Sequence, residues 1–205
     1  MSIMRVVLAL LLLLVLAGCV SVAKIETGEH AVGERMSVTL DSAWNKISVP
    51  GQGPEESWTM EGMWVDKLLF YSGIKNDQLM HAEPRTVGSG PPPKSYRFKS
   101  TMQPDEIVSM FEGMMTRDGS RFTLVKLEPA AFGGLKGFHF EYTLVRKLDN
   151  VQLTGLGYGA VSKGELFAIV YMAPRLEFYP RYSPRVEQLC RTALIRDGPV
   201  VAKSR

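Results

Sequence analysis

Apolar and polar residues alternate strictly in 36–40, where Ser37 and Thr39 separate three apolar side chains. Because successive side chains of a strand point to opposite faces, this pattern predicts a strand with one face in a core. Two apolar stretches in 57–74 flank a Glu-Gly pair with turn chemistry, so we expect a hairpin there. We expect a further short strand at 96–99.

A helical period begins at Pro104, a residue type that suits the first helical position, and two acidic residues follow it. One apolar stripe then has the spacing of a single helix face: Ile107, Met110, Phe111, Met114 and Met115. A face packed on a sheet needs this pattern, and so does a Met-rich binding groove. The core interpretation is favoured, and the groove stays open as the alternative.

Three more strands are expected at 122–127, 137–144 and 152–161, separated by turn-rich segments that include 129–134. The stretch 166–173 is apolar almost throughout and is followed by a proline. A strand of that composition is typical of a sheet centre covered on both faces.

A closing helix is expected from Ser183, as N-cap, and Pro184, as first helical residue, and it ends before 197–199. Its apolar stripe contains Cys190. The order of elements predicts an α+β fold with an antiparallel sheet. We expect one domain over 36–197, followed by a tail over 198–205.

Three features of this half of the chain resemble the PsbP-like family: Phe138-x-Phe140-x-Tyr142, the buried strand that ends at Pro174, and the final amphipathic helix. The resemblance covers about 96–197. It implies an antiparallel sheet sandwiched by helices. Because the family includes accessory and binding proteins rather than one shared chemistry, the resemblance implies no reaction and no functional residue.

The N-terminus has the layout of a secretory signal: Arg5 precedes an apolar run that ends at Ala17. A membrane-spanning helix needs about 20 apolar residues, and this run is shorter. Leu16-Ala17-Gly18-Cys19 resembles a bacterial lipobox. The resemblance implies a signal peptide over 1–18, cleavage before Cys19, and a diacylglycerol and an N-acyl chain (palmitate) on Cys19. The alternative is an ordinary secretory signal that contains a cysteine.

Two further expectations depend on the lipobox. In enterobacterial lipoproteins an Asp after the lipidated Cys favours the inner membrane, and here Val20 and Ser21 follow Cys19. This favours the outer membrane, with the domain facing the periplasm. Residues 20–35 show neither a helical nor an alternating period, so we expect 19–35 to be the lipidated cysteine and a tether.

Composition and charge narrow the function only by exclusion. The chain of 205 residues has a net charge of +3, too small to argue for a nucleic-acid partner. Once Cys19 is lipidated only Cys190 is left, so no intramolecular disulfide is expected. We interpret Cys190 as a buried, inert thiol, the alternative being a redox thiol.

Few residues point to catalysis. The three histidines lie far apart, no metal-ligand spacing is present, and we expect no metal or cofactor apart from the acyl groups on Cys19. His139 and Glu141 share one face of a strand and are the only candidates for an acid/base pair. A structural hydrogen bond or a solvent-facing pair is the simpler interpretation.

Three candidate surfaces are left. The first combines arginines and aromatic residues near a helix N-terminus and would bind an anion or a protein: Arg175, Tyr179, Arg181, Tyr182 and Arg185. The alternative, which is slightly favoured, is a connector whose rings cover the sheet edge and whose arginines are solvated. In the second, Gly155, Gly157 and Gly159 strip one strand face, which indicates either close packing or a slot for a flat ligand. In the third, the three tryptophans Trp44, Trp58 and Trp64 form a core cluster or a partner platform.

The sequence therefore predicts a membrane-anchored envelope lipoprotein with a non-catalytic domain that binds a protein partner or an envelope component. The alternative is an envelope hydrolase that uses His139 and Glu141.

Overall fold

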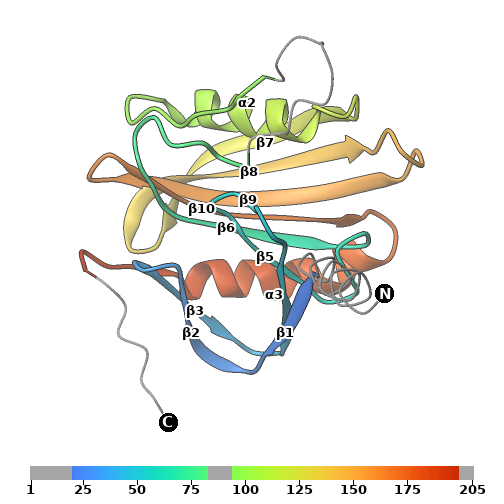
Figure 1. Cartoon of the computed structure of the whole chain (residues 1–205), viewed down its shortest axis with the longest axis horizontal. Helices are drawn as coiled ribbons and strands as arrows, with labels where there is room; N and C mark the ends of the chain where they lie inside the picture. Colours follow the sequence, from blue (N-terminus) through green and yellow to red (C-terminus); the bar gives the residue numbers. More distant parts are fainter. Residues whose placement is uncertain (1–19, 83–93, 199–205) are drawn as a thin grey trace, which may run out of the picture.

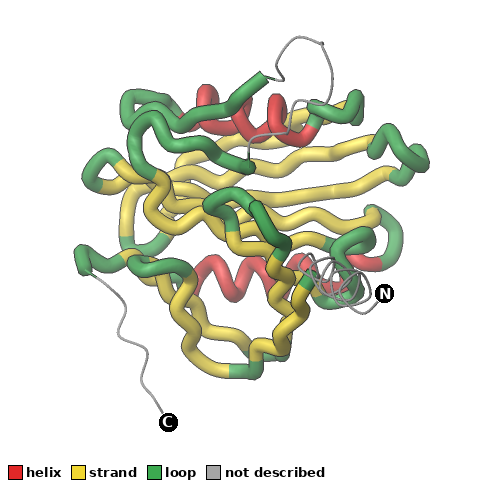
Figure 2. Tube along the Cα trace, in the orientation of Figure 1, coloured by secondary structure: helices red, strands yellow, loops and turns green. Residues whose placement is uncertain are grey.

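A computed structural model describes residues 20–82 and 94–198 of the chain. The expected signal peptide, Cys19, most of the proline-rich loop and the end of the tail lie outside these residues. Figures 1 and 2 show a layered α+β arrangement, with a large sheet between helix α2 on one face and helix α3 on the other. In the described part of the chain, no helix is both long and apolar enough to cross a membrane.

The large sheet has eight strands in the order β1-β4-β5-β6-β10-β9-β8-β7, all antiparallel to their neighbours. Its strands are β1 (Ser21–Ile25), β4 (Trp44–Ser48), β5 (Glu56–Thr59), β6 (Lys67–Ile74), β7 (Arg121–Phe132), β8 (Leu135–Val145), β9 (Gln152–Ser162) and β10 (Glu165–Pro174). A small sheet contains β2 (Gly28–Val32), β3 (Met36–Leu40) and β11 (Leu194–Ile195) in the order β11-β3-β2. This arrangement confirms the predicted α+β class and its antiparallel sheet.

Two hydrophobic cores lie on opposite faces of the large sheet. Helix α2 (Pro104–Met115) packs on one core, and helix α3 (Phe178–Thr192) with the small sheet packs on the other. Strand β10 contributes to both, because its successive side chains alternate between the two faces and nearly all are buried. The predicted central strand is therefore confirmed.

The three alternating glycines of β9 are covered by aromatic rings of β8. Gly155, Gly157 and Gly159 lie opposite Tyr142, Phe140 and Phe138. A Cβ atom on these glycines would come within 2.2, 2.3 and 2.6 Å of the rings. Rings that lie across glycines stabilise strand pairing by filling the missing side-chain volume. Close packing is therefore the correct interpretation of the glycine series, and the alternative, a slot for a flat ligand, is wrong because the aromatic rings of β8 fill that space.

The prediction of an unpatterned tether over 20–35 is wrong. Strand β1 pairs with β4, and β2 pairs with β3, so the folded domain begins at Ser21 rather than at residue 36. The sequence pattern does not predict strand β1, because β1 is an edge strand and four of its five residues are exposed. Backbone pairing, which needs no apolar side chain, holds it in place.

Two element boundaries also differ from expectation. Strand β7 continues through Pro129 into the segment that was expected to be a turn, because β7 is an edge strand, where a missing N–H is tolerated. Helix α3 begins at Phe178, so Pro184 lies inside it. Tyr179 stacks on Tyr171 of β10, and this contact extends the helix ahead of the proline.

The strand expected at 96–99 is replaced by a single bridge between Leu79 and Arg97. The segment is nevertheless held: Met80 N–H donates to the carbonyl of Tyr96 over 2.9 Å, and the side chain of Phe98 is fully buried. The hairpin expected in 57–74 is confirmed as β5 and β6.

Replacing Gly157 by Ala is expected to lower the free energy of unfolding by about 1–3 kcal/mol, since the new methyl group would overlap the Phe140 ring. Urea unfolding measures the loss. Gly198→Ala is the matched control, because no atom lies within 4 Å of the Cβ position there. An equal effect of the two substitutions would contradict the packing described for β8 and β9.

Candidate functional site

The proposed acid/base pair does not form a site. His139 is only 7% exposed, and its Nδ1 lies 3.1 Å from Oε1 of Glu128 on the neighbouring strand. The centre of its ring lies 4.5 Å from that of the Tyr158 ring, and the two ring planes are tilted by 32°. Glu141 pairs in register with Leu156, on the sheet face that α3 covers. Within the described residues, the partner of His139 is therefore Glu128 and not Glu141.

The expected arginine and aromatic surface is partly used for internal contacts. The Arg181 guanidinium lies 2.9 Å from Glu177 and 3.7 Å from Glu61, and Tyr182 donates its hydroxyl proton to Glu61. These contacts attach the first turns of α3 to the loop between β5 and β6. Arg175 and Arg185 are exposed, and the guanidinium of Arg185 lies over the ring of Tyr182. A binding role for this surface stays a prediction.

Cys190 is buried in α3, and burial raises the pKa of its thiol. Such a thiol carries almost no thiolate, the reactive form, so the expectation of an inert cysteine agrees with the structure. Among residues 20–82 and 94–198, no group of three or more His, Cys, Asp and Glu side chains is placed to hold a metal ion.

A cleft with a volume of about 1010 Å³ lies on the α2 face of the large sheet. Its existence follows from the lengths of the elements. Helix α2 has 12 residues and is about 18 Å long, whereas β8 with 11 residues spans about 36 Å. Figure 1 shows α2 running along the strands, so it covers only part of their length. The cleft occupies sheet surface beside the C-terminal half of α2.

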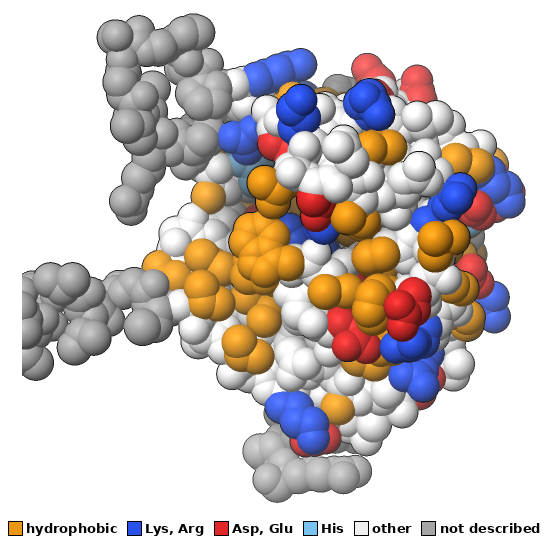
Figure 3. Space-filling model, turned by 90° about the vertical axis from the view of Figure 1, so that its right-hand side faces the viewer, with side chains coloured by type: hydrophobic (Ala, Val, Ile, Leu, Met, Phe, Trp, Pro, Cys, Tyr) orange, Lys and Arg blue, Asp and Glu red, His pale blue; other side chains and the backbone are white. Residues whose placement is uncertain are grey.

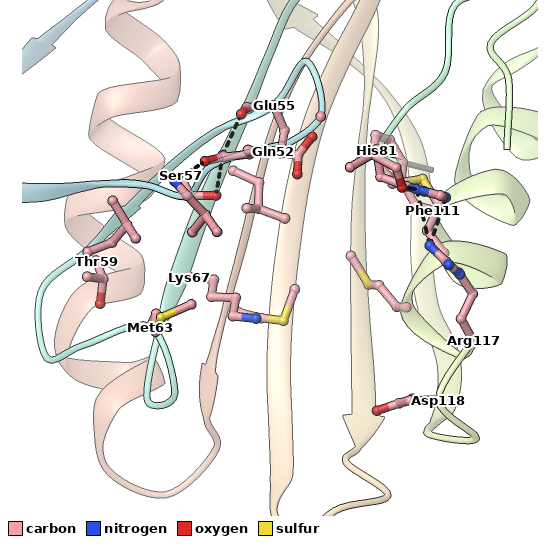
Figure 4. Close-up of a pocket in the computed structure, with 18 of the residues that line it drawn as sticks. Gln52, Glu55, Ser57, Thr59, Met63, Lys67, His81, Phe111, Arg117 and Asp118 are labelled. Carbon is pink, nitrogen blue, oxygen red and sulfur yellow. Dashed lines mark hydrogen bonds between the residues drawn. The ribbon is translucent and has the colours of Figure 1, made fainter. Parts of the chain in front are cut away.

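Apolar side chains from the sheet and from α2 form most of the cleft surface: Leu69, Phe111, Met114, Leu144, Leu153 and Met172. The loops on either side of β5 form the opposite wall, with Gln52 and Glu55 from one loop and Met63 from the other. Figure 4 shows these loop residues on one side of the cleft, and His81, Phe111 and Arg117 on the other. The volume is that of a small-molecule site.

Lys67, the first residue of β6, lies in the middle of the cleft between these two walls (Figure 4). Its side chain has no hydrogen bond or ion pair with any described residue. Burial lowers the pKa of Lys67, and the nearby positive charge of Arg146 lowers it further. The cleft therefore has an apolar surface with an unpaired ammonium group at its centre.

Glu55 lies across the cleft from α2. Burial raises the pKa of its carboxyl group, and its Oε2 atom is buried without a hydrogen-bond partner in the described part of the chain. On the α2 side, Arg117 Nη1 lies 3.1 and 3.0 Å from the two ring nitrogens of His81. The polar groups of the cleft thus lie among apolar side chains, as is usual for ligand pockets.

The loop between β5 and β6, which forms part of the cleft wall, is held by one buried carboxylate. Asp66 is fully buried and accepts hydrogen bonds from the hydroxyl of Thr59 at 2.6 Å and from the backbone N–H groups of Met60 and Glu61 at 3.0 and 2.8 Å. These bonds hold the turn that contains Met63 and Trp64 against the end of the sheet. No sequence motif indicates this role.

The structure separates residues that the sequence placed together. Trp44 and Trp58 are core residues, whereas Trp64 is 66% exposed and lines the cleft. The methionine stripe of α2 divides in the same way, because Met110 is buried while Met114 and Met115 are half-buried and line the cleft. Of the methionine stripe of α2, only the last turn, with Met114 and Met115, therefore lies where the alternative of a binding groove requires it. Sequence reasoning missed Lys67 and Glu55, which no pattern distinguishes from other surface charges.

Comparisons with known proteins support the fold. No protein-family model and no curated protein sequence match the chain. The solution structure of cyanobacterial PsbP (CyanoP) from Synechocystis sp. PCC 6803 is similar, with a TM-score of 0.55 and 12% identity over 87% of this chain and 95% of that one. At this identity the likeness shows a PsbP-like fold and nothing of the function.

A second solved structure is a more distant neighbour. LpqN of Mycobacterium tuberculosis, described as involved in cell envelope biogenesis, aligns with a TM-score of 0.38 and 9% identity over 86% of this chain and 91% of that one. A likeness of this degree does not support an inference about this chain.

Replacing Asp66 by Ala is expected to lower the free energy of unfolding by about 2–3 kcal/mol, because one buried and two partly buried donors lose their acceptor. Denaturant unfolding measures the change. Asp41→Ala, at an exposed position, is the control and should change stability little. Similar losses for both variants would show that Asp66 does not hold the loop.

Proposed function

We propose that this chain is a lipid-anchored protein of the bacterial cell envelope whose domain binds an apolar or amphiphilic envelope molecule in the α2 cleft. The observation that carries the proposal is the cleft itself, whose surface is mainly apolar. A binding or accessory role fits better than hydrolysis, because neither His139 nor Glu141 lines the cleft.

The position of the anchor supports this proposal. Strand β1 begins at Ser21, two residues after Cys19. Consecutive Cα atoms are about 3.8 Å apart, so Cys19 Cα lies within about 8 Å of Ser21 Cα. A lipid on Cys19 would therefore hold the edge of the sheet close to the bilayer, with no tether between them. Because Val20 and Ser21 follow Cys19, the periplasmic face of an outer membrane is favoured.

The strand register relates the cleft to this edge. Val22 lies opposite Ile47, Ile47 opposite Ser57, and Ser57 opposite Leu69. Directly opposed residues of antiparallel strands share a face, so Val22 lies on the same face as the other three residues, which line the cleft. Val22, on the strand that forms this edge of the sheet, therefore presents its side chain on the cleft face.

The surface near the cleft is also apolar. Val22, Val49 and Trp64 are exposed, and the last two line the cleft. Figure 3 shows hydrophobic side chains gathered into a patch on the end of the molecule that lies to the right in Figure 1. Exposed apolar patches are typical of surfaces that meet a membrane or a ligand. A cleft held beside a bilayer would exchange an amphiphilic ligand with it directly.

The anchor is tested by mass spectrometry of the mature protein isolated from membranes of a lipoprotein-processing host. The expected N-terminus is Cys19 carrying diacylglycerol and an acyl chain, and Cys19→Ser should abolish both processing at this site and membrane retention. A mature N-terminus at another residue, with no lipid on Cys19, would refute the anchor.

Cleft binding is tested with a fluorescent probe whose emission rises in apolar surroundings, on the mature chain carrying Cys19→Ser. Met114→Trp should weaken probe binding by about tenfold or more, since the indole fills space along the cleft wall. Ser109→Trp, on the exposed side of the same helix, is the matched control and should bind as the parent does. No binding to the parent, or equal binding to both variants, would contradict the proposed site.

A further inference from the structure

The position of Lys67 distinguishes it from the other cations of the cleft. On β6, Lys67 shares the α2 face with Leu69 and Tyr71, and it pairs in register with Met172 of β10. The residue is half-buried, and apolar side chains line the cleft around it. An unpaired charge in such surroundings is costly, because burial removes hydration that nothing in the chain replaces.

Each other cation that lines the cleft has a partner. Arg146 binds Asp149 through two hydrogen bonds, Arg117 contacts His81, and Lys94 lies over the ring of Tyr96. Lys67 alone among the described cations lining the cleft has no hydrogen bond, ion pair or cation–π contact. Its neighbour Arg146 adds positive potential at the same place.

The carboxylates of the cleft do not pair with Lys67. Asp66 is occupied by Thr59 and two backbone N–H groups, and Asp118 accepts the backbone N–H of Ser120 at 2.9 Å. Asp118 acts on Lys67 only through its field, and no ion pair joins them. Burial raises the pKa of Glu55, and no hydrogen bond or ion pair joins its carboxyl group to Lys67. Among the described residues that line the cleft, no carboxylate is therefore paired with Lys67.

We propose that the ligand of the cleft is an acidic amphiphile whose anionic head group binds the ammonium group of Lys67 while its hydrocarbon part lies against the apolar walls. This inference rests on the proposed function, because it assigns a chemical class to the ligand of the same cleft. The hydrocarbon part would contact Leu69, Met114, Leu153 and Met172. A carboxylate or a phosphate supplies the head-group chemistry, since both accept charge-assisted hydrogen bonds from an ammonium group.

The experiment compares amphiphiles that share a dodecyl chain and differ in head group. Dodecanoate and dodecyl phosphate are the acidic probes, dodecyl maltoside is the neutral probe, and dodecyltrimethylammonium is the cationic probe. Binding to the mature chain carrying Cys19→Ser is measured by calorimetry below the critical micelle concentration. The acidic probes should bind about 10-fold to 100-fold more tightly than the neutral one, the range expected for one charge-assisted hydrogen bond.

Variants of Lys67 assign the preference to one side chain. Lys67→Met should remove the preference for acidic probes and leave binding of the neutral probe unchanged, whereas Lys67→Arg should retain it. Lys75→Met, at an exposed position just after β6, is the matched control and should behave as the parent does. Circular dichroism and urea unfolding establish that each variant is folded.

The outcomes separate this inference from the proposed function. The inference is overturned if the parent binds neutral and acidic probes equally, or binds the cationic probe more tightly. It is also overturned if folded Lys67→Met still prefers the acidic probes. In each of these cases the cleft remains a binding site. If no probe binds, the proposed function fails as well. Stronger binding of dodecanoate than of dodecyl phosphate, or the reverse, identifies the head group.

Discussion

The burial of β10 on both faces is the constraint on which the rest of the structure depends. A strand whose side chains are apolar in both directions is stable only when each face of the sheet is covered. Helix α3 and the small sheet cover one face, and α2 covers the other. The aromatic residues of β8 lie over the glycines of β9 and complete the α2 face without a further helix.

The elements on the α2 face cover less of the large sheet than those on the α3 face, and the uncovered surface forms the cleft. The α3 face is closed by a helix of 15 residues together with three strands, whereas α2 has 12 residues and stands alone on its face. The loops around β5 approach the remaining surface from the other side. One of them is held by Asp66, and it is tied to α3 through Glu61 and Tyr182. The wall of the cleft is thus positioned by residues from both faces of the sheet.

Much of the fold could be predicted from local patterns. The stripe of α2, the composition of β10 and the turn between β5 and β6 each follow from the geometry of a single element. The edge strand β1 could not be predicted, because it is held by backbone pairing with β4 and four of its five residues are exposed. The start of α3 was missed for a related reason: Tyr179 is ordered by Tyr171, which lies eight residues earlier on another element.

The sequence by itself determined the fold class, the order of most elements, the burial of Cys190 and the lipobox-like motif at Cys19, because each depends on residue types at short spacing. Only the tertiary structure decided which charges meet. It placed His139 beside Glu128 rather than Glu141, paired Arg181 with Glu61, and left Lys67 in an apolar cleft without a partner among the described residues. These contacts join residues from separate elements, and the distances between their side chains exist only after the strands have paired and the helices have packed.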